Sequence, residues 1–211
     1  MIGRIIDWID FRVGIKEFHQ KHIAFPLPEP AGFWSLFSGL LIGCIAILVV
    51  TGFYMLAFYI PEPVQAHQSI RDMCNNTPYG ALFRNAHRWS ATMGIFFLTV
   101  HAFHIMAKRA YRSPRELNWW LGLTLAVIFI LSTITGIILP WDWRSYWELV
   151  IWADWLNTIP LVGDGLKNLM LSSFSLGRSF SFHIILLPAL LLGVLAFHII
   201  IFRLLGMADR V

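Results

Sequence analysis

The chain has 211 residues, of which 57% are hydrophobic and 13% are charged, and its mean hydropathy is +0.65. This composition excludes an ordinary soluble domain and predicts an all-α integral membrane protein in contact with lipid. The net charge of +4 does not indicate a nucleic-acid partner, because the basic residues follow a membrane topology. No linker or repeat divides the sequence, so we expect one domain over residues 1–211.

The first predicted element is an amphipathic segment at residues 1–14. Its isoleucines are interleaved with charged residues, a pattern typical of a helix that lies on the membrane surface. The segment contains acidic residues and lacks a cleavage site of small residues, so we do not expect a removable signal peptide.

Four apolar runs follow, each long enough to cross a bilayer as a helix. They predict a four-transmembrane-helix bundle with helices at about 33–60, 80–107, 117–139 and 180–205. Basic residues gather before the first run and between the second and third. By the positive-inside rule, we expect these two basic regions and both chain ends on the cytoplasmic or equivalent negative side of the membrane, the N side. The longer connections, 61–79 and about 140–179, are then expected on the opposite, positive side of the membrane, the P side.

Two histidines, His87 and His101, lie within the second apolar run. Their separation makes about 3.9 helical turns, so both side chains leave nearly the same face, with a rise of roughly 21 Å between them. The fourth run repeats the pattern with His183 and His198, whose separation is longer by one residue. Because these two helices run in the same direction, His87 and His183 should share one depth, and His101 and His198 another.

Imidazoles that face each other across a helical bundle can supply both axial ligands of a haem. Two such depths predict two b-type haems that carry electrons, because bis-histidine ligation leaves no open position on the iron. A lone histidine in an apolar helix is more often a packing residue, but four at matched depths indicate function. A zinc or di-iron site is disfavoured, because no carboxylate or thiolate lies at either depth.

Glycines in the apolar runs are candidate haem contacts, because a missing Cβ lets a flat macrocycle approach a helix closely. Ordinary small-residue helix packing is the alternative. In the third run, Gly122 and Gly136 are separated by the same number of residues as His87 and His101. In the first run, the residue that precedes Gly52 by this number is Ser38, not a glycine. The candidate cofactor-binding glycines are Gly39, Gly52, Gly122 and Gly136.

Arginines near the histidines are candidate partners of the haem propionates through charge-assisted hydrogen bonds. Simple snorkelling to the membrane interface is the alternative for each of them. The candidates are Arg84, Arg88 and Arg178 on the P side and Arg203 on the N side.

Four stretches resemble a known family: NAHRWSA at 85–91, LPWDWRSYWE at 139–148, IPLVGDGL at 159–166 and GRSFSFH at 177–183. Together they resemble the N-terminal half of cytochrome b, and in particular the cytochrome b6 branch of the Rieske/cytochrome b complexes (bc1 and b6f types). The resemblance covers about residues 20–205. The HRW triplet after the first ligand and the longer step between His183 and His198 agree with the b6 branch rather than the fused mitochondrial type.

The resemblance implies the roles of the four histidines. His87 and His183 would bind the iron of the P-side, low-potential haem b, and His101 and His198 that of the N-side, high-potential haem b. Electrons would cross the membrane between these two haems.

The resemblance also implies that Pro140, Trp141 and Asp142, with the amphipathic segment at about 143–154, form one wall of a quinol-oxidation pocket. One electron of the quinol would pass to a Rieske iron–sulfur protein and the other through the haems to a quinone near the N side. The chain would then be the electron-transfer subunit of a quinol:cytochrome c (or plastocyanin-like acceptor) oxidoreductase, inactive alone.

Two positions depart from the family pattern. Leu36 stands where b6 proteins have the cysteine that holds a c-type haem, so we do not expect a covalent third haem. His104 stands where the family usually has an arginine near the N-side haem. The family's remaining helices are absent from this chain.

The resemblance implies several partners. We expect a second subunit like the cytochrome b C-terminal half (subunit IV), a Rieske protein and a c-type cytochrome, in a homodimeric complex. A bacterial plasma membrane is favoured, with a thylakoid-type membrane as the alternative.

Two other functions fit parts of the pattern. A dihaem cytochrome b that anchors a respiratory dehydrogenase or reductase would use the same histidine pairs, but the PWD and IPxxG segments favour the quinol-oxidising complex. A channel or transporter could use the histidines as a proton relay.

Overall fold

The structure, a computed structural model, describes residues 10, 11, 17, 33–173 and 175–205. Most of the surface segment expected at residues 1–14 lies outside this part. The regular secondary structure of the described part is entirely helical, as predicted. Within these residues, four helical segments are long and apolar enough to cross a membrane. They are α3 (Ser35–Leu56), α5 (Gly80–Ala107), α6 (Glu116–Ile138) and the run Leu176–Leu205 formed by α9, η2 and α10.

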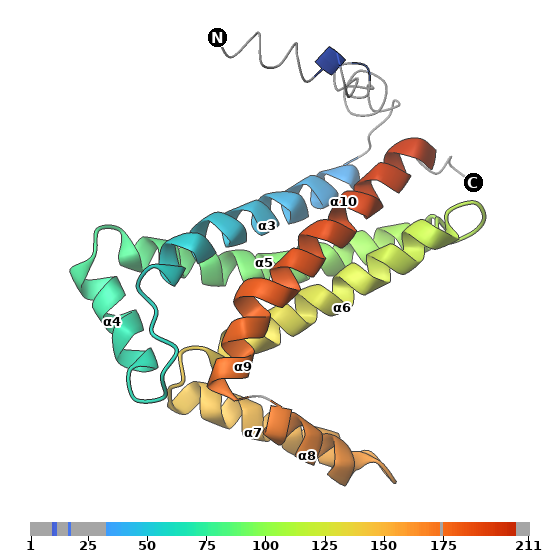
Figure 1. Cartoon of the computed structure of the whole chain (residues 1–211). Coiled ribbons are helices and arrows are strands. Elements are labelled where there is room, and N and C mark those ends of the chain that lie inside the picture. The colour runs from blue at the N-terminus through green and yellow to red at the C-terminus, as the bar shows by residue number, and fades with distance from the viewer. Residues whose placement is uncertain (1–9, 12–16, 18–32, 174, 206–211) are drawn as a thin grey trace.

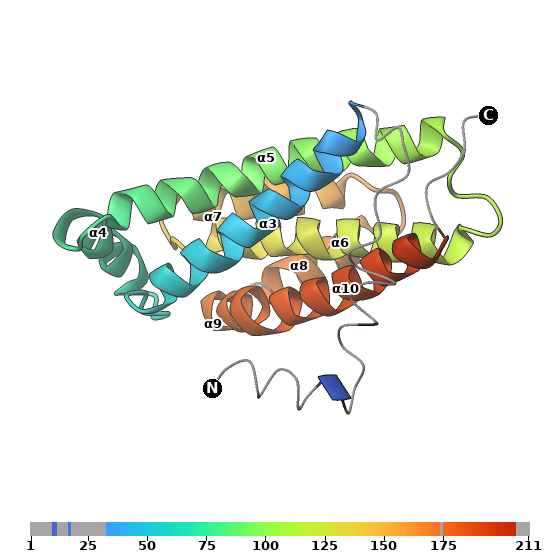
Figure 2. The same cartoon turned by 90° about the horizontal axis from the view of Figure 1, so that it is seen from above.

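The four spans form two adjacent pairs, in which α3 packs along α5 and α10 packs along α6 (Figures 1 and 2). Helices α5 and α10 run in the same direction, and α3 and α6 run in the opposite one. The connection between α5 and α6 lies at the same end of the bundle as the end of α10 (Figure 2). The alternating topology therefore brings the second and fourth spans into the same sense, as the sequence predicts.

The apolar core lies halfway along the bundle. It combines buried side chains of three spans: Ile45 of α3, Leu125, Ile128 and Phe129 of α6, and Leu187 and Leu191 of α10. At this level α5 contributes Gly94, and a Cβ placed on this glycine would lie 2.5 Å from Cζ of Phe129. The Phe129 ring thus fills the space that a larger residue at position 94 would need.

The fourth span contains one π-helical turn. This turn, η2 (Phe182–Leu186), joins α9 (Leu176–Ser181) to α10 (Leu187–Leu205), and the N–H of Leu187 donates to the carbonyl of Phe182 five residues earlier. Pro188 follows directly; it has no N–H, and its ring would crowd a carbonyl four residues back in a regular α-helix. The π turn relieves this conflict and inserts one extra residue into the helix.

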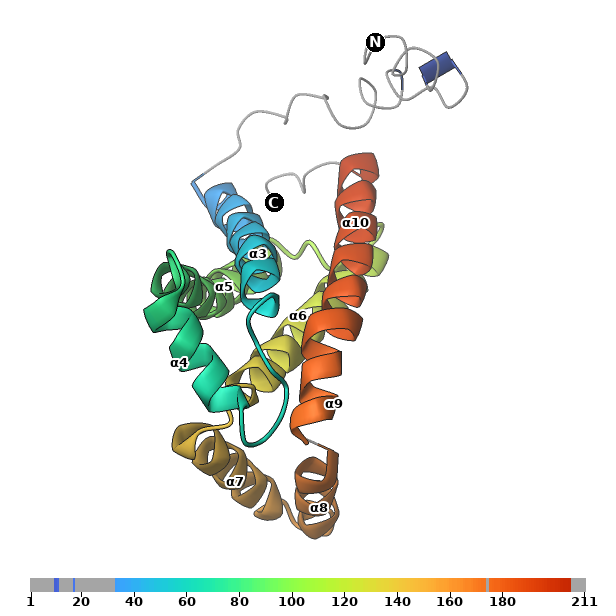
Figure 3. The same ribbon diagram turned by 60° about the vertical axis from the view of Figure 1, so that its left-hand side comes forward.

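Three shorter helices fill the two longer connections and lie together at one end of the bundle (Figure 3). Helix α4 (Ala66–Asn76) lies in the connection 61–79, where the sequence analysis expected no helix. Its Ala66, Ile70 and Met73 are buried on one face at helical spacing. Helix α7 (Trp143–Asn157) covers the amphipathic segment expected at about 143–154, and it packs against α8 (Gly163–Ser173).

The contact between Gly94 and Phe129 gives a test of the core. Gly94→Ala should destabilise the protein, because overpacking a core costs about 1–3 kcal/mol and exceeds the gain of about 1 kcal/mol from alanine's helix propensity. Gly43→Ala in α3 is the matched control, because a Cβ there meets nothing within 4 Å. Thermal unfolding in detergent, followed by circular dichroism, should show a lower midpoint for Gly94→Ala only. Equal midpoints for the two variants would contradict this packing.

Candidate functional site

The imidazoles of His87 on α5 and His183 in η2 face each other inside the bundle, with ring centroids 6.1 Å apart and ring planes at 65°. A metal–imidazole bond is about 2 Å long and the ring centre lies about 1 Å beyond the nitrogen, so two rings on opposite sides of one metal ion have centroids ~6 Å apart. The observed separation therefore fits a single ion between the two side chains.

The hydrogen bonds of this pair leave one nitrogen of each ring for a metal. Nδ1 of His183 lies 2.9 Å from the Ser132 carbonyl, and since a carbonyl only accepts, this nitrogen carries the proton. Nδ1 of His87 lies 2.8 Å from Oγ1 of Thr51, whose hydroxyl donates to the Ile47 carbonyl at 2.6 Å. The Thr51 oxygen thus accepts from His87. In both rings Nε2 keeps its lone pair, the arrangement typical of histidine metal ligands.

His101 on α5 and His198 on α10 form a second pair at the other end of the bundle. The two rings are close enough to interact electrostatically. Nδ1 of His101 lies 2.9 Å from Oγ of Ser38 on α3. The ring of His198 lies beside the backbone of Asn118, and its buried Nδ1 has no side-chain partner among the described residues.

Three of the four predicted glycines lie beside these rings. A Cβ placed on Gly136 would lie 2.6 Å from Cε1 of His183, one on Gly122 would lie 3.4 Å from Cε1 of His198, and one on Gly52 would lie 3.5 Å from Cε1 of His87. Gly39 differs, because a Cβ there meets nothing within 4 Å. Its neighbour Ser38 contacts the fourth histidine instead.

The donor set fits a metal that brings its own macrocycle. Within the described ranges no group of three or more His, Cys, Asp or Glu side chains could hold a bare metal ion. The pair His87 and His183 offers two ligands on opposite sides of one point and leaves the other coordination positions to a group such as a porphyrin.

The predicted propionate partners lie in different surroundings. Arg84 is half-buried one turn before His87, on the same face of α5, whereas Arg88 is exposed. Arg178 on α9 is exposed and donates to the Ser172 carbonyl at 2.9 Å. Arg203 is half-buried near the end of α10.

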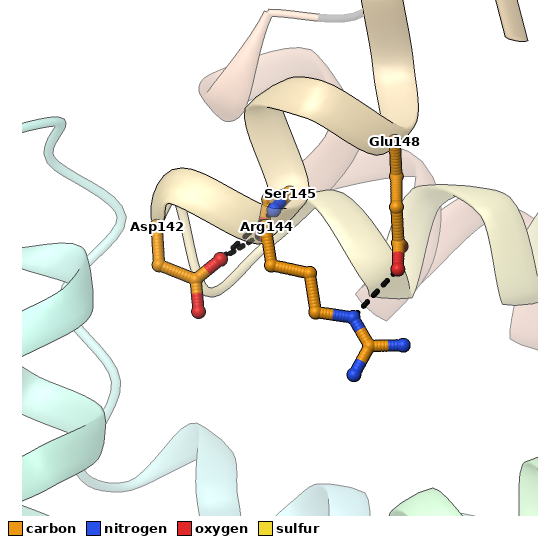
Figure 4. Close-up of polar contacts among 4 residues, drawn as sticks. All are labelled: Asp142, Arg144, Ser145 and Glu148. Carbon is orange, nitrogen blue, oxygen red and sulfur yellow. Dashed lines mark hydrogen bonds and ion pairs between the residues drawn. The ribbon is translucent and has the colours of Figure 1, made fainter. Parts of the chain in front are cut away.

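The segment Pro140–Asp142 leads from α6 into α7, and Figure 4 shows Asp142 with its partner Ser145. Trp141 has a left-handed backbone with φ of 47°. Asp142 is the N-cap of α7, and one of its carboxylate oxygens accepts from the N–H of Ser145 at 2.9 Å and from the Ser145 hydroxyl at 2.8 Å. Beyond the cap, Nε of Arg144 pairs with Glu148 at 2.6 Å. Burial acts to raise the pKa of Asp142, but the Ser145 hydrogen bonds prevail and hold this pKa below its usual value. The carboxylate is therefore ionised at neutral pH.

Tyr59, just after α3, holds the start of this segment. Its hydroxyl donates to the carbonyl of Leu139 at 2.7 Å, and its ring stacks on Phe180 of α9 at a centroid distance of 5.6 Å. Burial raises the pKa of Tyr59 to about 12, so the phenol remains a donor.

Sequence reasoning missed the hydroxyl residues that contact the histidines: Ser38, Thr51 and Thr135, the last of which lies 3.3 Å from Nδ1 of His183. A signal was present, because Thr51 and Thr135 each directly precede a candidate cofactor-binding glycine. Sequence reasoning also missed Tyr59, whose contact with Leu139 joins residues far apart in the chain.

Known proteins are similar to this chain in sequence and in fold. The family model described as Cytochrome b/b6/petB matches residues 23–206. The chain is 31% identical to cytochrome b6 of Synechococcus sp. (strain RCC307) over 204 residues, which is 94% of each chain. It is also 31% identical to cytochrome b6 of Heliobacterium modesticaldum (strain ATCC 51547 / Ice1) over 211 residues, covering 97% of this chain and 99% of the relative.

A solved structure entitled "Hyperthermophilic respiratory Complex III" is similar in fold, with a TM-score of 0.83 and 25% identity. The match covers 96% of this chain but only 55% of that longer chain. The family match spans most of the sequence and includes the four apolar spans of the described part, two of which carry the histidine pairs. This chain is an integral membrane protein that belongs to the cytochrome b/b6 family.

Proposed function

We propose that this chain is the dihaem cytochrome b subunit of a bc1/b6f-type quinol oxidoreductase and that it carries electrons across the membrane between two b haems. The observation that carries this proposal is the pair His87 and His183, whose rings face each other with centroids 6.1 Å apart. Their Nδ1 atoms are occupied by Thr51 and Ser132, so that both Nε2 atoms are available to one iron.

The four histidines act as two ligand pairs, His87 with His183 on the P side and His101 with His198 on the N side. A haem with two imidazole ligands exchanges single electrons and has no open position for oxygen. The hydrogen bonds at Nδ1 hold the proton on that nitrogen and fix the orientation of the ring.

Small residues and arginines complete the two proposed sites. Gly52, Gly122 and Gly136 leave room beside the imidazoles, because a Cβ at any of them would contact a histidine ring. Arg84, Arg88, Arg178 and Arg203 are the proposed propionate partners, and Arg84 has the best support because it shares a helix face with His87.

Pro140, Trp141 and Asp142, with α7, are the proposed wall of the quinol-oxidation pocket. Asp142 is ionised, and one of its carboxylate oxygens accepts from Ser145, which lets it begin α7 as the N-cap. Tyr59 supports the wall through the Leu139 carbonyl.

The proposed partners are a chain like the C-terminal half of cytochrome b, a Rieske iron–sulfur protein and a c-type cytochrome, in a homodimeric complex of a bacterial plasma membrane. The relatives named cytochrome b6 are matched over 94% or more of their length, which supports a b6-type subunit that shares its quinol pocket with a second chain.

Ligand substitutions test the proposed haems. The purified wild-type complex should contain two non-covalent b haems per copy of this chain, and His87→Ala or His198→Ala should each lower that number to about one. Pyridine haemochrome spectra and reduced-minus-oxidised spectra give the count. His67→Ala is the matched control, because this exposed histidine of α4 lies outside both pairs and should leave both haems bound. Wild-type protein without a b-type α-band would overturn the proposal.

The space beside His183 gives a second test. Gly136→Ala would bring a methyl group to 2.6 Å from Cε1 of His183, closer than two carbon atoms can approach. The ring must shift, so the P-side haem should be lost or become high-spin while the N-side haem stays low-spin. Electron paramagnetic resonance of the oxidised complex separates these signals. Gly193→Ala in α10 meets nothing within 4 Å and should leave both signals unchanged. An unchanged P-side signal in Gly136→Ala would show that this glycine does not set the haem site.

A further inference from the structure

The two histidine pairs differ in the hydrogen bonds of their Nδ1 atoms. On the P side, His183 donates to the Ser132 carbonyl and His87 to Thr51. On the N side, the backbone of Asn118 lies beside His198, and Nδ1 of His101 contacts the hydroxyl of Ser38 at 2.9 Å. Ser38 is therefore the one side chain in the described part of the molecule that hydrogen-bonds to a histidine of the N-side pair.

Ser38 occupies a position beside a histidine ring, and glycines occupy the three corresponding positions beside the other rings. Gly52 on the same helix and Gly122 and Gly136 on α6 each lie beside a histidine ring. The spacing from Ser38 to Gly52 equals the spacing from Gly122 to Gly136. At the fourth place this chain thus puts a hydroxyl where the other three places have only a hydrogen atom.

The direction of the hydrogen bond follows from ligation. If Nε2 of His101 binds the iron, Nδ1 must carry the ring proton, and the Ser38 oxygen accepts it. A hydrogen bond accepted from Nδ1–H makes the imidazole a more basic ligand. A more basic ligand favours the ferric state over the ferrous state, and second-shell hydrogen bonding is one of the ways in which a protein sets a haem potential.

We propose that Ser38 is a positioning residue for His101 and that its hydroxyl lowers the reduction potential of the N-side haem. This inference rests on the proposed haem sites and deepens them. The backbone of Asn118 lies beside His198, so Ser38 is the side-chain partner of this pair in the described part of the chain. The P-side haem, which lies at the other end of the bundle, should not depend on it.

The experiment is a spectroscopic potentiometric titration of the intact complex carrying Ser38→Ala, Ser38→Gly or Ser38→Thr. Removal of the hydroxyl in the first two variants should shift the reduction equilibrium of the N-side haem toward the ferrous state by about tenfold, an upward shift of ~59 mV for a one-electron couple. Ser38→Thr keeps the hydroxyl and should stay near the wild-type potential. The P-side haem of the same sample is the internal control.

An N-side potential that is unchanged in Ser38→Ala and Ser38→Gly would overturn the proposal. If Ser38→Ala loses the N-side haem and Ser38→Thr keeps it, the hydroxyl is required to orient His101, which supports the proposal. Loss of that haem in both variants would overturn it, because the site would then depend on the size of the serine. Absence of b haem from the wild-type complex would instead refute the proposed function, and this outcome is recognised before any variant is compared.

Discussion

The structure depends on one property of the α-helix: seven residues make almost two complete turns. Residues at steps of seven therefore drift by only about 20° per step and stay on one face of the helix. Three spans of this bundle carry such a series facing the interior. The series are Ser38, Ile45 and Gly52 on α3, His87, Gly94 and His101 on α5, and Gly122, Phe129 and Gly136 on α6. The middle member of each lies in or against the apolar core, and the outer members meet at the two histidine pairs.

The fourth span satisfies the same constraint by a different route. The separation of His183 and His198 is one residue longer than that of the histidines of α5. A regular α-helix would turn the extra residue by about 100° and move one ring off the shared face. The π turn at Phe182–Leu186 absorbs one residue, and Pro188 explains why the turn forms there. The π turn before Pro188 thus accommodates the extra residue between His183 and His198, and His183 lies opposite His87.

The sequence was sufficient to predict the features that follow from hydropathy and helical period. The four spans, their alternating directions and the shared depth of His87 and His183 could all be derived this way, because a bilayer requires long apolar helices that alternate in direction. The π turn that brings His183 opposite His87 could not. Helix α4 could not be derived, because its apolar face is short and its stability depends on packing against α5. The contact of Tyr59 with Leu139 was equally out of reach, since hydrogen-bond partners 80 residues apart leave no periodic signal.

The hydroxyl residues of the bundle show how polarity is tolerated in an apolar interior. A buried imidazole N–H without an acceptor is costly. An apolar helix offers few acceptors besides an occasional carbonyl such as that of Ser132, because its carbonyls are mostly paired within the helix. A serine or threonine adds an acceptor at little cost, since its own hydroxyl can return to a carbonyl four residues back, as Thr51 does with Ile47. A hydroxyl beside a glycine therefore gives a helix both room for a neighbouring ring and a partner for its nitrogen. This combination occurs at Thr51 and Gly52 and again at Thr135 and Gly136, both at the end of the bundle where the facing rings of His87 and His183 are seen. At the other end Ser38 takes the place of the glycine itself, so that one residue both lies beside His101 and supplies a hydroxyl to its nitrogen.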